Sequence, residues 1–194
     1  MLVAIACCAT GLGLVACGND EESGPGMHHS TTAPADTAPA DHNAADVTFA
    51  TAMIPHHQQA VQMADQALKK ATNAQVKQLA TAIKAAQAPE IEEMSAWLKG
   101  WDQMVPTPGM GHSMASGEGM MTTEEMMALG NQTGAAFDKM WVRMMITHHQ
   151  GAVAMAKMEQ TSGQNPKSKQ LAQQIERGQT TEITTMQKLL TTLP

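Results

Sequence analysis

The sequence contains no tyrosine, and only two phenylalanines and three tryptophans among its 194 residues. Because β-sandwiches and barrels use aromatic and β-branched residues to cover their pleated surfaces, this scarcity argues against an all-β fold. Charged residues make up only 15%, with 12 Lys and Arg against 18 Asp and Glu, which gives a formal net charge of −6. No basic surface is available for phosphates, so nucleic-acid binding is excluded and helices remain the expected element.

The three cysteines all lie within the first 17 residues. Residues 1–16 carry no charged side chain and are shorter than the ~20 residues of a membrane span, so we expect a cleaved export signal. The string LVAC at residues 14–17 resembles a bacterial lipobox and predicts a lipid anchor on Cys17; a secretory signal without lipid is the alternative. The mature protein is then exported to the outer face of the cytoplasmic membrane, the periplasm or the cell surface, and has no thiol for catalysis or metal binding.

The rest of the chain divides into a tether and a repeated domain. Residues 17–45 are rich in Gly, Pro, Ala, Thr, Ser and Asp, which predicts a disordered tether. Residues 46–101 align without gaps to residues 138–193, with 21 of 56 positions identical. The domain at 46–194 therefore contains repeat one (46–101), a loop (102–122) rich in Met, Pro and Gly, and repeat two (123–194).

The apolar residues recur every three or four positions, as on one face of an amphipathic helix. Pro55 falls inside the first such segment, where it predicts a kink or a boundary. The periodic segments are residues 47–71, 76–101, 123–131, 134–161 and 167–192. Four long helices in two antiparallel pairs predict an all-α four-helix bundle, with residues 123–131 as a short extra helix.

Methionine and histidine are abundant, with 18 and 8 residues, and they recur in both repeats. The block MIPHHQQAVQMA at residues 53–64 matches MITHHQGAVAMA at residues 145–156. Helical spacing places one His and two Met of each block on one face, while the second His points about 100° away. Neutral imidazole and thioether ligands together suit copper, in either the Cu(I) or the Cu(II) state. The candidate ligands are Met53, His56, His57 and Met63, and Met145, His148, His149 and Met155.

The loop between the repeats offers the same donors in the run Met110, His112 and Met114. We expect Met120 and Met121 to be exposed there too, and to help capture metal. Methionines spaced along one face of a helix are also common as ordinary core residues. This alternative interpretation applies to Met63, Met94, Met155 and Met186.

Two carboxylates occupy matched positions on the apolar stripes, in QAPEIEEM at residues 87–94 and QTTEITTM at residues 179–186. A carboxylate there is costly unless it is paired, and a His of the neighbouring helix is the expected partner. Such a pair either orients a metal-binding imidazole or is a purely structural ion pair, and the sequence favours neither. The carboxylates are Glu90 and Glu182, and Gln87 and Gln179 would complete the same polar network.

The doubled M-I-x-H-H-Q-x-A-V-x-M-A block, each copy followed by E-I-x-x-M, resembles the family catalogued as domain of unknown function 305. The resemblance covers roughly residues 46–194. It implies a ferritin-like helical bundle, and because studied relatives are exported copper-binding proteins, it implies copper as the ligand.

Three functions remain open from the sequence. The first is an extracytoplasmic copper-binding protein that buffers copper or hands it to an unknown partner. The second is a structural or interaction bundle without metal. The third, a di-metal oxidase, needs Glu-x-x-His, but the third residue after each Glu is Glu93 or Thr185. The sequence also lacks a nucleotide-binding loop, a nucleophile elbow and a zinc-protease motif, so we expect a binding protein rather than an enzyme.

Overall fold

The computed structural model describes residues 41–107 and 119–194. Cys17, Met110, His112 and Met114 lie outside these residues. Within the described part of the chain there are five helices and no strand, as the sequence predicts. The helices are α1 (Ala44–Lys70), α2 (Ala74–Gly100), α4 (Thr123–Asn131), α5 (Gly134–Ser162) and α6 (Pro166–Leu190).

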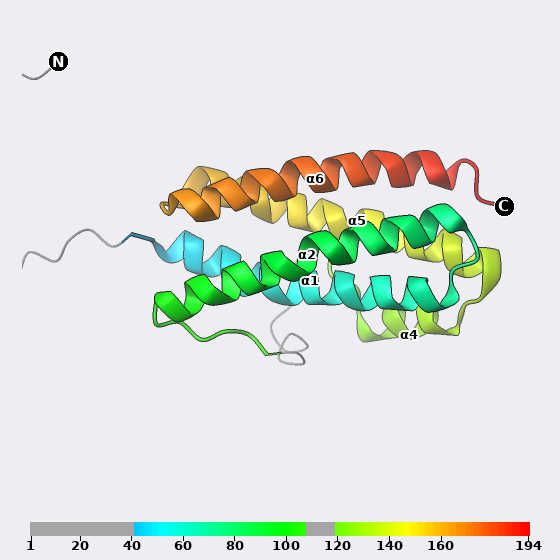
Figure 1. Cartoon of the computed structure of the whole chain (residues 1–194), viewed down its shortest axis with the longest axis horizontal. Coiled ribbons are helices and arrows are strands. Elements are labelled where there is room, and N and C mark those ends of the chain that lie inside the picture. Colours follow the sequence, from blue (N-terminus) through cyan, green and yellow to red (C-terminus); the bar gives the residue numbers. More distant parts are fainter. Residues whose placement is uncertain (1–40, 108–118) are drawn as a thin grey trace, which may run out of the picture. The chain divides into compact units, whose positions relative to one another are not determined.

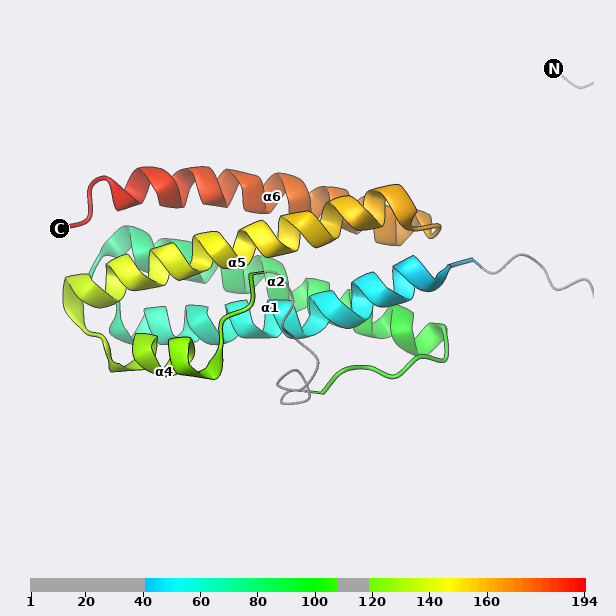
Figure 2. The ribbon, with the colours of Figure 1, turned by 180° about the vertical axis from the view of Figure 1, so that it is seen from behind.

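The four long helices form two hairpins, one from each repeat. Helix α1 packs along α2 and α5 packs along α6, while contact between α1 and α5 joins the two hairpins (Figure 1). The short helix α4 lies beside these helices at one end and touches α5 (Figure 2). The predicted all-α four-helix bundle with one extra helix is confirmed. No helix in the two described segments has the length and apolar character needed to cross a membrane.

Asparagine begins three of the long helices. The Asn43 side chain accepts hydrogen bonds from the Ala45 and Asp46 amides and forms a capping box with Asp46. Asn73 and Asn165, which are equivalent in the two repeats, cap α2 and α6 in the same way. These caps satisfy amides that a helix start leaves without partners.

The first helix runs through Pro55, as the periodic segment at residues 47–71 predicts. Of the two effects expected for this proline, a boundary is excluded, because α1 continues from Ala44 to Lys70. The helix also begins before residue 46, inside the segment expected to be tether. Asn43 caps it there, and the His42 ring stacks on Trp101 with the ring centroids 4.5 Å apart. These local contacts give the end of the expected tether a fixed place on the domain.

The buried apolar residues form two clusters. The first cluster joins α1 from Ala60 onward to the start of α5 and contains Trp141, whose indole Nε1 donates to the Met63 carbonyl at 2.9 Å. The second joins the start of α1 to the later part of α5 and contains Phe49. On all four long helices, one polar turn separates the residues of one cluster from those of the other. This turn carries His56 and His57 on α1, Gln87 and Glu90 on α2, His148 and His149 on α5, and Gln179 and Glu182 on α6.

Candidate functional site

Four histidines form a polar layer between the two apolar clusters, which we call the histidine layer. It consists of His56 and His57 on α1 and of His148 and His149 on α5. Each is at most 1% exposed. Histidine is rarely so deeply buried, and burying four imidazoles together costs free energy unless they find polar partners or a ligand.

The two repeats meet at His56 and His148. Their ring centroids lie 3.8 Å apart, with the ring planes tilted by 41°. Burial lowers the pKa of His148 well below its usual value, and the neighbouring histidines lower it further. His148 is therefore neutral at neutral pH, so one ring nitrogen keeps a lone pair that a metal can accept.

Each second histidine pairs with a carboxylate of its own repeat. The Nε2 atom of His57 lies 2.8 Å from Glu90 Oε2, and His149 Nε2 lies 2.7 Å from Glu182 Oε2. The predicted His–Glu pairing across neighbouring helices is present in both repeats. The two carboxylate side chains are 20% and 23% exposed, so they lie at the rim of the layer. A carboxylate on one imidazole nitrogen fixes the ring orientation and its tautomer, as it does for metal-binding histidines.

The Nδ1 atoms of both paired histidines are buried. Among the described residues, neither His57 Nδ1 nor His149 Nδ1 has a hydrogen-bond partner. Gln87 is 2% exposed, and neither the oxygen nor the nitrogen of its side-chain amide has a hydrogen-bond partner. Gln179 is 4% exposed, and its Oε1 atom also has no partner. Buried polar atoms are nearly always satisfied in folded proteins, so this cluster of exceptions is typical of a place that a ligand or water completes.

The four candidate methionines flank the histidine layer on both sides. Met63 and Met145 belong to the first cluster, whereas Met53 and Met155 belong to the second. Each side therefore has one thioether from each repeat. Within residues 41–107 and 119–194, no three His, Cys, Asp or Glu side chains are arranged to hold a metal ion. The layer and its flanking residues thus offer thioether sulfur beside imidazole nitrogen as donors.

Other methionines differ in part from expectation. Met94 and Met186 are fully buried core residues, in agreement with the packing interpretation. Met121, expected to be exposed, is only 8% exposed and belongs to the first cluster. Met120 is half-buried. The reason is that the segment before α4 docks onto α1 through Gln59, whose side chain bonds to the backbone of Met121. The sequence contained one signal of this contact, since Gln59 breaks the match between the repeats by aligning with Gly151.

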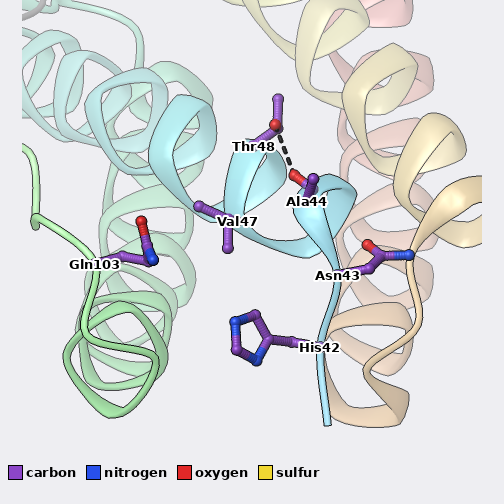
Figure 3. A pocket seen from close by; sticks show the side chains of 6 residues that line it. All are labelled: His42, Asn43, Ala44, Val47, Thr48 and Gln103. Atoms are coloured by element: carbon purple, nitrogen blue, oxygen red, sulfur yellow. Dashed lines mark hydrogen bonds between the residues drawn. The ribbon is translucent and has the colours of Figure 1, made fainter. Parts of the chain in front are cut away.

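A separate open pocket of about 450 Å³ lies at the start of α1. Figure 3 shows the His42 imidazole beside it, between the chain at Gln103 and the first turn of α1. None of the four histidines of the layer lines this pocket. Its lining residues are His42, Asn43, Ala44, Val47, Thr48 and Gln103.

Solved structures share this architecture. CopM in the Cu(II)-bound form is 35% identical, with a TM-score of 0.67 over 76% of this chain and 96% of that chain. CopM in the Cu(I)-bound form is 34% identical, with a TM-score of 0.65 over the same shares of the two chains. A putative secreted DUF305 protein from Streptomyces coelicolor is 33% identical, with a TM-score of 0.68 over 76% of this chain and 92% of that chain.

A search of curated proteins finds no match. Residues 46–190 match the family described as Domain of unknown function (DUF305). This range contains repeat one, repeat two except its last four residues, all four layer histidines and both paired carboxylates. It is also the range that folds as the bundle. The chain belongs to the DUF305 family.

Proposed function

We propose that this protein binds copper outside the cytoplasm and buffers it or hands it on. The observation that carries the proposal is the contact between His56 and His148, whose buried rings lie 3.8 Å apart across the two repeats. Each of these histidines adjoins a second one whose ring is held by a carboxylate. The arrangement supports one shared site at the junction of the repeats rather than two separate sites.

The donors favour copper, and Cu(I) in particular. Thioether sulfur selects soft ions such as Cu(I), and imidazole binds copper in both oxidation states. Imidazole alone also binds zinc, so the thioethers beside the histidines are what favour copper. Closely grouped carboxylates, which would suit two hard metal ions, do not occur in the histidine layer. CopM has been solved with Cu(I), Cu(II) and Ag bound, so the same fold accommodates these ions in a relative about 34% identical.

The di-metal oxidase gains no support from the site. Glu90 and Glu182 each bond to a histidine of their own repeat, and neither is followed by the Glu-x-x-His spacing of such enzymes. A structural bundle without metal remains the alternative that the experiment below must separate. In that case the His–Glu pairs would serve only to specify the packing of the helices.

Cu(I) competition against a chromogenic chelator tests the proposal. The double variant His56→Gln and His148→Gln removes both imidazoles of the junction. Loss of a group that only orients a metal-binding histidine costs about 10- to 100-fold in metal affinity, so loss of two ligands should weaken Cu(I) binding more than about 100-fold. His42→Gln is the matched control because His42 stacks on Trp101 outside the layer, and it should bind as wild type.

The outcome also distinguishes the layer from the loop. Replacing Met110, His112 and Met114, in the segment that the sequence predicts to be a loop, should lower the number of bound ions and leave the tightest site intact, because a segment of that kind would lose conformational entropy on closing around an ion. If both junction histidines can be replaced without loss of tight binding, the histidine layer is structural and the copper proposal for it is wrong.

A further inference from the structure

The histidine layer is closed to solvent. All four of its imidazoles are at most 1% exposed. An ion can therefore reach them only when some covering segment moves. The long helices around the layer are poor candidates, since every turn is held by its own backbone ladder and by the apolar clusters on both sides. The one described non-helical segment that docks near the layer is the short stretch Gly119–Met121, which we call the strap.

The strap crosses from α1 to α5 at the level of the layer. Gln59 on α1, one turn after His56, donates from Nε2 to the Met121 carbonyl at 2.8 Å and accepts from the Met121 amide at 2.7 Å. At its other end, Gly119 lies directly on α5. A Cβ added there would be 2.7 Å from the Thr147 carbonyl oxygen and 2.9 Å from the Gly151 Cα. Figure 2 shows the segment before α4 running across α1 toward α5.

The strap explains a difference between the two repeats. Gln59 and Gly151 are equivalent positions, each three residues after the first histidine of its pair. Repeat one uses the long amide side chain to bond to the strap, whereas repeat two uses a glycine to let the strap backbone approach. Gly119 itself has φ +86°, a conformation that glycine adopts without strain. Gln59 and Gly151 are thus equivalent in the repeats, and both accommodate the strap, one through hydrogen bonds and the other through the absence of a side chain.

The attachment of the strap is weak compared with that of the helices. Both hydrogen bonds to Met121 come from the Gln59 side chain, so rotation of this single side chain releases both. A hydrogen bond between neutral groups adds little net stability, since water replaces it on opening. Met121 also packs in the first cluster, and this apolar contact favours the docked position of the strap.

We propose that the strap is the gate of the histidine layer, latched by Gln59, and that it lifts to let a soft metal ion in or out. The inference rests on the copper proposal for the identity of the ion. The accessibility of the histidines can be measured without metal. A gate changes the rates of loading and release together, whereas a ligand changes the affinity.

The first measurement is the rate at which diethyl pyrocarbonate modifies the layer histidines in the metal-free protein, read by peptide mass spectrometry. Gln59→Ala should raise this rate about tenfold, the ratio that about 1.4 kcal/mol supports. Gly119→Ala places a Cβ against α5 at the other end of the strap, and it should also raise the rate of histidine modification. Gln62→Ala is the matched control, because Gln62 is exposed one turn further along α1.

A second control separates local opening from global unfolding. Leu189 is buried in the first cluster, and Leu189→Ala lowers overall stability without removing either hydrogen bond that holds the strap. If Leu189→Ala speeds modification as much as Gln59→Ala does at matched loss of stability, the gate is wrong. Equal rates in the Gln59→Ala and Gln62→Ala variants would also overturn it.

The second measurement follows Cu(I) transfer to and from a chromogenic chelator. Gln59→Ala should accelerate loading and release by the same factor and leave the dissociation constant within about twofold. A weaker affinity with unchanged rates of histidine modification would make Gln59 part of the binding site and overturn the gate. If the wild type binds no Cu(I), the copper proposal fails, while the modification rates still decide whether the strap covers the layer.

Discussion

Asp46 and Asp138 occupy equivalent positions in the two repeats, and each binds the interhelical turn of the other repeat. Asp46 on α1 accepts hydrogen bonds from the amides of Gln164 and Asn165, between α5 and α6. Asp138 on α5 accepts from the amides that follow α1 and from the Thr72 hydroxyl. The hairpins are thus linked at both ends by reciprocal contacts, which fixes the crossing of α1 and α5 and with it the approach of the layer histidines.

We expect Asp138→Asn to lower the free energy of unfolding by about 2–3 kcal/mol. Asp138 is 1% exposed and accepts from several donors at once, and hydrogen bonds to a charged acceptor are worth more than neutral ones. Urea denaturation measures the change. Asp65→Asn is the matched control, since Asp65 forms an exposed ion pair with Lys84 and its loss should cost less than about 1 kcal/mol. Equal effects of the two variants would contradict the reciprocal link.

The two ends of the bundle differ in one respect. Glu159 is 2% exposed and lies beside Asp46, whereas its equivalent in repeat one is the buried Ala67. Burial raises the pKa of Glu159 to about 7, and the Asp46 carboxylate raises it further against the opposing influence of Ser168 and Lys169. Burial also acts to raise the pKa of Asp46, but its hydrogen bonds outweigh this and lower it.

The raised pKa of Glu159 predicts that stability falls as the pH rises. An unfolded chain releases this proton near the ordinary value of 4.5, whereas the folded protein keeps it to about pH 7. The folded state therefore binds more protons between these values, and its stability decreases across that window. Glu159→Gln should abolish this part of the decrease in urea denaturation series from pH 4.5 to 8. Glu92→Gln replaces an exposed carboxylate on α2 and should retain the wild-type slope.

The buried side chain of Glu159 is larger than its equivalent in repeat one, and a neighbouring residue is correspondingly smaller. Repeat one has Ala67 and Ala71, and repeat two has Glu159 and Gly163 at the equivalent positions. A Cβ at residue 163 would overlap the Glu159 carboxylate. The larger side chain in one position is thus matched by the absence of a side chain in the other.

This exchange predicts strong coupling between the two positions. Gly163→Ala alone should destabilise the protein by about 1–3 kcal/mol through overpacking, although its φ of −68° suits alanine. In a Glu159→Ala background the same change should cost clearly less, because the overlap with the carboxylate is gone and only the contact with the backbone carbonyl oxygen of residue 159, 2.7 Å from the added Cβ, remains. A double-mutant cycle measures the coupling. Gly178→Ala, with nothing within 4 Å, is the control and should stabilise α6.

Much of the fold could be predicted from the sequence because the repeat supplies each helix twice. The short helix at Thr123–Asn131 was predicted with its observed bounds. The His–Glu pairs were also predictable, since a carboxylate on an apolar stripe needs a partner from the neighbouring helix. The helix through Pro55 was predicted from the apolar periodicity of residues 47–71, and packing on both sides of α1 offsets the hydrogen bond that the proline cannot make.

The contacts between the repeats were harder to predict. Asp46 and Asp138 are identical in the alignment, but their partners lie in turns more than 60 residues away. The burial of Met121 depends on Gln59, which is distant in sequence and different in the second repeat. Helical periodicity identifies which face is buried but gives no information about which loop covers it, and this limits any prediction of the histidine layer from sequence.

A prediction for the N-terminus concerns Cys17, which lies outside the described residues. If the lipobox interpretation is correct, Cys17→Ser should move the protein from the membrane fraction to the soluble fraction of cells. One lipid-modified cysteine is then the membrane attachment. Immunoblotting after a carbonate wash measures the distribution. Retention of the variant in the membrane would reject the lipid anchor.

The last prediction separates stability from function in the histidine layer. Gln87 is 2% exposed and both atoms of its amide group lack a partner, so Gln87→Leu removes an unsatisfied buried polar group. The metal-free variant should gain about 1 kcal/mol of unfolding free energy. Gln78→Leu, at an exposed position on α2, is the matched control and should change stability by less than about 0.5 kcal/mol.

The affinity for copper should fall in the Gln87→Leu variant, although its stability rises. If the Gln87 amide supports the metal or its imidazole ligands, the more stable Gln87→Leu variant should bind Cu(I) about 10- to 100-fold more weakly, as is typical when a group that orients metal ligands is lost. Chelator competition and urea denaturation on the same preparations measure both quantities. A variant that gains stability and keeps full affinity would show that the amide has no part in binding. A variant that loses stability would show that the amide is satisfied in the folded protein, against the structure. Opposite shifts in stability and affinity are the expected signature of a polar layer retained for its ligand, because stability alone would favour an apolar residue at this position.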